Sequence, residues 1–246
     1  MIKSNQRRIG YKDSLNMCGR FVGFRKLEEL EKYFPIDKSV VEAAANYNIT
    51  PSQKILAMVR RDQKNVLDLF HWGLVPFWAK DISMGNRLIN ARAETVASKP
   101  SFRTAFKKQR CLILADGFYE WKGVKGKKEP FFLTLPDKKP FAFAGLWETW
   151  NDKGKIDQSY LSCTIITKPA SESVLPVHHR MPAIVSPEKY AAWLDPDNQD
   201  AGKLEDILEN WTIRDLINQP VSKQVNNART NDASNIKPLR QTEIDF

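Results

Sequence analysis

A chain of 246 residues is long enough for one large domain or two small ones, and its 42% hydrophobic and 27% charged residues are ordinary for a globular protein. The longest apolar runs, 111–115 and 141–147, are too short to span a bilayer, and no apolar segment of a secretory signal follows the basic first residues. The 38 Lys and Arg against 29 Asp and Glu give a formal net charge of +9, which is compatible with a polyanionic partner without requiring one.

The cysteines exclude two further classes of protein. Cys18, Cys111 and Cys163 are far apart and odd in number, so they suggest no disulfide framework. No CxxC pair or Cys/His cluster has the spacing of a zinc site, so we expect no metal. A reducing, cytoplasmic location is the simplest interpretation.

In chain order, residues 1–16 are polar and basic without periodicity, and we expect them to be a disordered tail or a mis-assigned extension. One domain is expected over residues 17–240. The elements predicted in it are a strand at 18–24, an amphipathic helix at 25–34, a hairpin of 55–60 and 66–72, strands at 110–114, 118–122, 131–135, 141–147, 161–167 and 183–186, a helix capped by Ser186 with Pro187 in its first turn, and a helix at 201–211.

Strands outnumber helices in this series and do not alternate with them as in a parallel βαβ sheet. The predicted fold class is therefore α+β, a single domain around a mainly antiparallel, barrel-like sheet with peripheral helices.

Several polar stretches could carry chemistry, although each has a purely structural alternative. Cys18 is a candidate nucleophile or an incidental buried thiol. Glu120, between two aromatic residues, is either an exposed strand position or a carboxyl group whose pKa is raised in an apolar pocket, suited to proton transfer. His178, beside a second histidine, is either a catalyst or a structural residue.

The same two interpretations apply to the candidates for nucleic-acid binding. Arg20, Arg92 and Arg180 are either solvated surface charges or phosphate contacts, and only their grouping would decide. Trp72 begins the aromatic segment 72–78, which is either core or a platform on which nucleobases stack.

Taken together, eight segments resemble the SRAP family, the SOS response-associated peptidases that process abasic sites in damaged DNA. The segments run in the order of the family and cover most of residues 17–230: MCGRF (17–21), NYNITP (46–51), WGLVPFW (72–78), NARAET (90–95), RCLILADGFYEW (110–121), FAGLWE (143–148), TIITKPA (164–170) and HHRMPAI (178–184).

The resemblance implies a protein that binds abasic sites in single-stranded DNA and links to them covalently. The family's linking cysteine corresponds to Cys18, its site asparagine to Asn90, its proton-transferring glutamate to Glu120 and its active-site histidine to His178. The resemblance implies neither a metal nor an organic cofactor, no membrane partner, and a monomer that is nucleoid-associated when bound to damaged DNA.

The resemblance also implies a set of residues that hold the DNA. Arg20, Arg92 and Arg180 correspond to phosphate-binding positions and Thr167 to a threonine near the site, whereas Trp72 is a weaker assignment for base stacking. Little sequence preference is expected, because the recognised nucleotide lacks a base.

The chemistry depends on the N-terminus. An abasic sugar opens to an aldehyde, with which an α-amine forms an imine, and a thiol on the same residue then closes a thiazolidine ring. Cys18 provides both groups only if residues 1–17 are absent. Three explanations stay open: translation starts at Met17, the Met17–Cys18 bond is cut after synthesis by the family's (auto)peptidase activity, or the extension is retained and the protein only binds DNA.

Two rival functions follow from the same residues. A non-covalent single-stranded DNA-binding module would need the arginines and aromatics but not the Cys18 thiol. A thiol peptidase acting on other proteins would need Cys18 and an open peptide cleft, and would ignore DNA.

Overall fold

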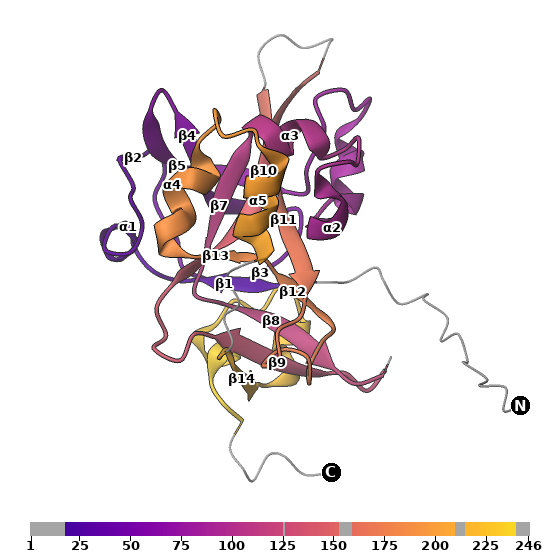
Figure 1. Cartoon of the computed structure of the whole chain (residues 1–246). Helices are drawn as coiled ribbons and strands as arrows, with labels where there is room; N and C mark the ends of the chain where they lie inside the picture. The colour runs from indigo at the N-terminus through magenta and orange to yellow at the C-terminus, as the bar shows by residue number, and fades with distance from the viewer. Residues whose placement is uncertain (1–17, 125, 153–158, 210–214, 240–246) are drawn as a thin grey trace, which may run out of the picture.

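The centre of the computed structural model, which describes residues 18–124, 126–152, 159–209 and 215–239, is a closed barrel (Figure 1). Its ring contains β4 (Lys54–Arg61), β5 (Lys64–Trp72), β7 (Arg110–Ala115), β10 (Phe141–Asn151) and β11 (Ser159–Pro169). Antiparallel pairing joins β5 to β4, β4 to β7, β7 to β10 and β10 to β11, and the parallel pairing of β11 with β5 closes the ring. The predicted α+β fold around a mainly antiparallel, barrel-like sheet is confirmed.

A second sheet packs at one end of the barrel, below it in Figure 1. Its strand order is β14 (Ile217–Pro220), β9 (Glu129–Thr134), β8 (Gly117–Lys122), β1 (Phe21–Gly23) and β3 (Asn46–Ile49). Short strands extend the barrel sheet: β2 (Lys38–Ser39), β6 (Asn90–Arg92), β12 (Arg180–Pro182) and β13 (Ile184–Val185). The second sheet matters for function because it brings β1 and β8 side by side.

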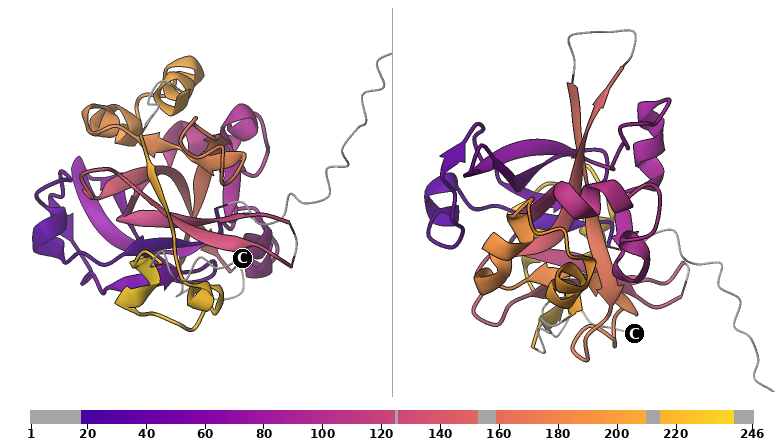
Figure 2. Two further views of the ribbon diagram at one scale, coloured as in Figure 1. Left: turned by 90° about the horizontal axis from the view of Figure 1, so that it is seen from below. Right: turned by 45° about the horizontal axis from the view of Figure 1, so that its top comes forward.

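Short helices cover the outside of the barrel, and the β10–β11 hairpin extends beyond it (Figure 2). They are α1 (Leu27–Leu30), α2 (Ala93–Val96), α3 (Arg103–Lys108), α4 (Tyr190–Leu194) and α5 (Ala201–Glu209), with 3₁₀ turns at Ile82–Arg87, Pro187–Lys189, Lys223–Asn226 and Ala233–Ile236. Within the described ranges, none of the helices has the length and apolar character needed to cross a membrane.

Alternation along the barrel strands produces two hydrophobic cores, since neighbouring side chains on a strand point to opposite faces. On β7, Cys111 and Ile113 belong to the cluster that fills the barrel, whereas Leu112 and Leu114 belong to the cluster beneath the helices. Phe21 of β1 joins the inner cluster, with its ring centroid 5.3 Å from that of Trp72. Phe21 thereby anchors the start of the described chain at the end of the barrel.

The structure differs from the predicted elements mainly at their ends. The hairpin forms with a two-residue turn, Asp62 and Gln63, whose φ values of 48° and 61° fit a tight turn between strands. The helix predicted at 25–34 is reduced to the four residues of α1. Ser186 precedes the 3₁₀ turn begun by Pro187, but its hydroxyl bonds to the Glu188 carboxylate instead of capping the backbone. Residues 1–16 and the end of the helix predicted at 201–211 lie outside the described residues.

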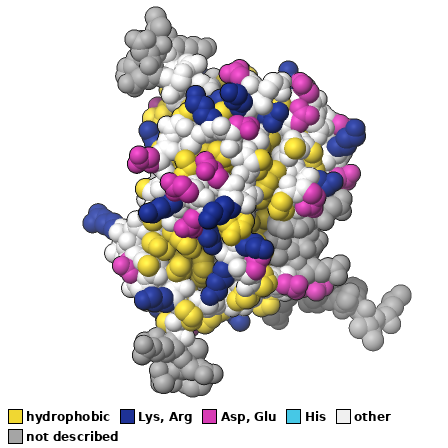
Figure 3. Space-filling model, turned by 90° about the vertical axis from the view of Figure 1, so that its left-hand side faces the viewer, with side chains coloured by type: hydrophobic (Ala, Val, Ile, Leu, Met, Phe, Trp, Pro, Cys, Tyr) yellow, Lys and Arg dark blue, Asp and Glu magenta, His cyan; other side chains and the backbone are white. Residues whose placement is uncertain are grey.

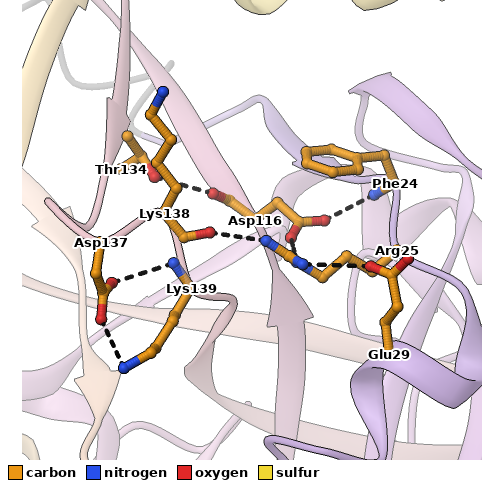
Figure 4. Close-up of polar contacts among 8 residues, drawn as sticks. All are labelled: Phe24, Arg25, Glu29, Asp116, Thr134, Asp137, Lys138 and Lys139. Carbon is orange, nitrogen blue, oxygen red and sulfur yellow. Dashed lines mark hydrogen bonds and ion pairs between the residues drawn. The ribbon is translucent and has the colours of Figure 1, made fainter.

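Asp116, between β7 and β8, fixes the end of β1 (Figure 4). Its buried carboxylate accepts hydrogen bonds from the Phe24 N–H at 2.8 Å and from Arg25 Nε at 2.6 Å. Next to it, Gly117 is required because a Cβ there would lie 2.3 Å from the Phe132 ring. Asp116 thus joins β1 to β8, the two strands that carry the candidate site.

Asp116→Asn is expected to lower the free energy of unfolding by about 2 kcal/mol. The one oxygen of the amide cannot accept both hydrogen bonds, so its NH2 group faces the N–H of either Phe24 or Arg25, and the charge that pairs with Arg25 is lost. Urea unfolding measures this difference. The control is Asp137→Asn, which removes an exposed carboxylate paired with Lys139 in the same region and should change stability by less than about 0.5 kcal/mol. Equal effects of the two substitutions would contradict the role assigned to Asp116.

Candidate active site

Cys18 lies at the end of the barrel, three residues before the anchoring Phe21. Its side chain is 1% exposed, and its backbone N–H donates a hydrogen bond of 2.9 Å to Glu120 Oε1. Burial and the neighbouring Glu120 raise the pKa of the Cys18 thiol. The nitrogen of Cys18, and not a preformed thiolate, is therefore the group already placed against a proton-transfer partner.

Glu120 is buried although it lies between Tyr119 and Trp121 on β8. Only 2% of the residue is exposed, so the alternative of an exposed strand position is wrong. Burial raises the pKa of Glu120 to about 8, while the hydrogen bond from the Cys18 N–H acts in the opposite direction. At neutral pH a large share of this carboxyl group is protonated, so it can both donate and accept a proton.

His178 and Asn90 approach the same point from other elements. His178 precedes β12, and its Nδ1 lies 3.9 Å from Glu120 Oε2 and 3.1 Å from the Arg180 backbone nitrogen, which donates to it. Burial lowers the pKa of His178, so the imidazole is neutral at pH 7. Asn90 begins β6, which is held by parallel pairing with β11, and its Nδ2 donates to the Cys18 carbonyl oxygen at 3.5 Å. These four predicted residues are brought together.

A pocket of about 330 Å³ opens at this cluster. Its wall includes Glu120 and His178 together with Arg20, Trp121, Lys128 and Asn226. The pocket wall therefore presents a carboxyl group, an imidazole and two cations, and its volume is large enough for a sugar.

Arg20 is the predicted arginine that lines the pocket. Its Nη1 donates to Asn48 Oδ1 at 2.8 Å and to the Val225 carbonyl, and its guanidinium lies 5.5 Å from the centre of the Trp121 ring. Asn48 in turn donates to the carbonyl of Thr230 at 2.7 Å. Residues 223–236 thus hold Arg20 in place, directly through the Val225 carbonyl and indirectly through Asn48.

Arg180 and Arg92 differ in their availability to a ligand. Arg180 is 9% exposed and forms a two-pronged ion pair with Glu94, and its Nη2 also donates to the Thr167 carbonyl at 2.7 Å. Arg92 is exposed at the end of β6. Thr167 is 0% exposed, so the expectation that its side chain contacts DNA directly fails, and it supports Arg180 instead.

Trp72 is wrong as a base-stacking residue. It is 1% exposed, packs against Phe21, and its indole N–H donates to the Ile89 carbonyl at 2.9 Å. The core alternative therefore holds for Trp72. Two aromatic residues of the same segment, Phe77 and Trp78, are 54% and 46% exposed.

Sequence reasoning missed three pocket residues. Lys128 stands in a basic run, 122–128, that resembles any solvated hairpin end, and Asn226 stands in a polar segment without a pattern. Trp121 also lacks a usable signal, because consecutive residues of a strand point to opposite faces and its place next to Glu120 predicts the other side of β8.

The described parts of the chain contain no group of three His, Cys, Asp or Glu side chains arranged to hold a metal ion. On the face that Figure 3 shows, basic and acidic side chains are interspersed, so that face is not a continuous basic surface.

Comparisons with known proteins identify the family of this chain. The family model "SOS response associated peptidase (SRAP)" matches residues 17–228. The chain is 40% identical over 218 residues to "Abasic site processing protein YoqW" of Bacillus subtilis, covering 87% of this chain and 96% of that protein. It is 30% identical to "Abasic site processing protein YedK" of Escherichia coli, covering 91% and 100%.

A solved structure supports the fold independently. A Bacteroides thetaiotaomicron protein superposes with a TM-score of 0.79 at 22% identity, covering 91% of this chain and all of that one. With the match over residues 17–228 and the extensive identity to curated relatives, the conclusion is direct. This chain belongs to the SOS response associated peptidase (SRAP) family.

Proposed function

We propose that this protein processes abasic sites in single-stranded DNA by forming a covalent thiazolidine crosslink through Cys18, after the residues that precede it are removed. The single observation that carries the proposal is the 2.9 Å contact between the Cys18 nitrogen and Glu120 Oε1 beside a pocket of about 330 Å³. The names of the relatives, which are called abasic site processing proteins, support the choice of substrate.

In the proposed reaction the Cys18 α-amine adds to the aldehyde carbon of the opened sugar. The resulting carbinolamine loses its hydroxyl as water, with Glu120 as the acid that protonates the leaving oxygen, and an imine remains. The Cys18 sulfur then bonds to the imine carbon as the thiol proton moves to the nitrogen, which closes the ring. His178, neutral and 3.9 Å from Glu120, assists sugar opening, and Asn90 orients Cys18 through its carbonyl.

The DNA strand would be held by its phosphates and by its neighbouring bases. Arg20 lines the pocket and Arg92 is exposed, so both are available to phosphates. Arg180 requires that Glu94 move aside. Phe77 and Trp78, in place of Trp72, supply exposed rings for stacking.

The backbone of Cys18 supports removal of the residues before it. Its φ of 40° lies in the left-handed region, which costs a non-glycine residue about 1–3 kcal/mol, and this strain is released when the preceding peptide bond is cut. In the (auto)peptidase activity that we include in the proposal, the Cys18 sulfur attacks the Met17 carbonyl carbon, and the Cys18 nitrogen leaves as the free α-amine with the thiol proton. Water then hydrolyses the resulting thioester, which frees the thiol and releases the preceding residues with a carboxyl end. A peptidase acting on other proteins fits less well, because the buried Cys18 thiol is not accessible to a peptide bond of another protein.

The test uses protein that begins at Cys18 and single-stranded DNA with or without one abasic site. We expect an adduct that survives heating in denaturant with the abasic strand and only background with the intact strand. Denaturing gels measure the yield, and mass spectrometry checks that the adduct has lost one water. Equal yields with the two strands, or none with either, would overturn the proposal.

A further inference from the structure

Lys128 occupies the mouth of the pocket but has no role in the chemistry described above. It lies directly before β9 at the end of the β8–β9 hairpin, which projects from the body of the protein (Figure 1). It lines the same pocket as Glu120 and His178, and its positive charge lowers the pKa of both. Its ammonium group is thus close to the point at which a bound sugar would react.

The ammonium of Lys128 makes no hydrogen bond or ion pair with the part of the chain that the structure describes. Arg20, the other cation of the pocket wall, uses its Nη1 to donate to Asn48 and Val225, so only its remaining N–H groups can reach a ligand. Lys128 is itself exposed to solvent, and it lines a pocket whose acidic group, Glu120, is largely protonated at neutral pH.

The substrate of the proposed function supplies the matching anion. An abasic nucleotide carries a phosphate on each side of its sugar, so a sugar that enters the pocket brings phosphates to its mouth. A lysine binds a phosphate as a mobile point charge and needs no fixed geometry. Phosphate oxygens would therefore complete the contacts that Lys128 lacks within the protein.

We propose that Lys128 binds a backbone phosphate next to the abasic nucleotide, as a DNA-binding residue beyond those predicted from the sequence. This inference rests on the proposed function for its substrate. It requires no bond to form or break at the lysine, since the ammonium acts only through charge and hydrogen bonds. The contact orients the sugar from the β8–β9 hairpin, in addition to the contact that Arg20 offers from the pocket wall.

The experiment measures binding of the chain that begins at Cys18 to a single strand with a tetrahydrofuran abasic analogue, which has no aldehyde and cannot crosslink. Loss of one phosphate contact in Lys128→Gln should reduce the slope of log Kd against log salt by about 0.7. The same term corresponds to about fivefold weaker binding at about 0.1 M salt. Lys128→Arg should keep the wild-type slope.

Lys127→Gln is the matched control, because it removes the same charge from the adjacent exposed residue, which does not line the pocket. The inference is overturned if Lys128→Gln keeps the wild-type slope or if Lys127→Gln changes it equally. Crosslinking is measured separately on aldehyde-containing DNA. Failure to crosslink with a normal Lys128 effect would reject the chemistry at Cys18 and leave the phosphate contact standing.

Discussion

Replacing Glu120 by Gln is expected to slow adduct formation with abasic DNA by about 10²–10⁴-fold, the usual contribution of a positioned general acid or base. Glutamine has nearly the same shape and can still accept the Cys18 N–H bond, so the site should keep its geometry. It cannot protonate the leaving hydroxyl of the carbinolamine. Single-turnover rates of adduct formation at saturating DNA measure the effect.

The pH dependence of adduct formation follows from two groups with similar pKa values, the Glu120 carboxyl group and the Cys18 α-amine. The pKa of Glu120 is raised to about 8 by burial, and a free α-amine has a pKa of about 7.7–8.0. The amine must lose its proton to attack, whereas Glu120 must hold one to act as an acid, so the wild-type rate should pass through a maximum near these values. Glu120→Gln should lose the fall on the alkaline side and keep the rise due to the amine.

The pH dependence of the stability provides an independent test of the raised pKa of Glu120. Its pKa in the folded state, about 8, lies above the value of about 4.3 in an unfolded chain. Burial of the neutral acid therefore contributes stability that is present at low pH and is lost as pH rises through about 8. The melting temperature of Glu120→Gln relative to wild type should increase between about pH 5 and about pH 9.

Glu148→Gln is the matched control for both measurements of catalysis. Glu148 is also buried and burial raises its pKa to about 7, but it does not line the pocket. Its substitution should leave the adduct rate and its pH profile unchanged. A wild-type rate in Glu120→Gln, or an equal loss in both variants, would reject the role of Glu120.

Strands with a strong apolar pattern could be predicted from the sequence, and their ends could not. The hairpin of β4 and β5 and the long β10 and β11 follow runs of buried residues. The strands β6, β12 and β14 have three or four residues each, and they exist because their backbones pair with β11 or β9. Such pairing depends on the tertiary fold and leaves no local signal.

The candidate site was predictable in its reactive groups and not in its exposed surface. The chemical types of Cys18, Glu120 and His178 and the family resemblance predict them as site residues, and the fold brings them together. Trp72 was misassigned because an aromatic in a strand has the same sequence pattern whether it faces the core or solvent. The sequence leaves Arg180 open as a solvated charge or a phosphate contact, and its ion pair with Glu94 is not visible there because the two residues are far apart in the chain.

The second large effect on adduct formation is expected from changes at the N-terminus, because the proposed ring needs an amine and a thiol on one residue. A chain that keeps residues 1–17 has the Cys18 thiol but an amide nitrogen, so it can form only a reversible thiohemiacetal. A chain that begins at Cys18 with Cys18→Ala has the amine but no thiol, so it should stop at the imine. Both should give heat-stable adduct only at the level of intact DNA.

Borohydride separates these two half-reactive proteins, because it reduces an imine to a stable amine and leaves a thiohemiacetal without a permanent bond. It should therefore trap the Cys18→Ala chain on abasic DNA and fail to trap the extended chain. Intact mass, measured before DNA is added, shows whether the extended chain has removed its own first residues. An extended chain of unchanged mass that crosslinks as well as the Cys18 start would exclude the α-amine as the nucleophile, and the contact of the Cys18 nitrogen with Glu120 would then need another explanation.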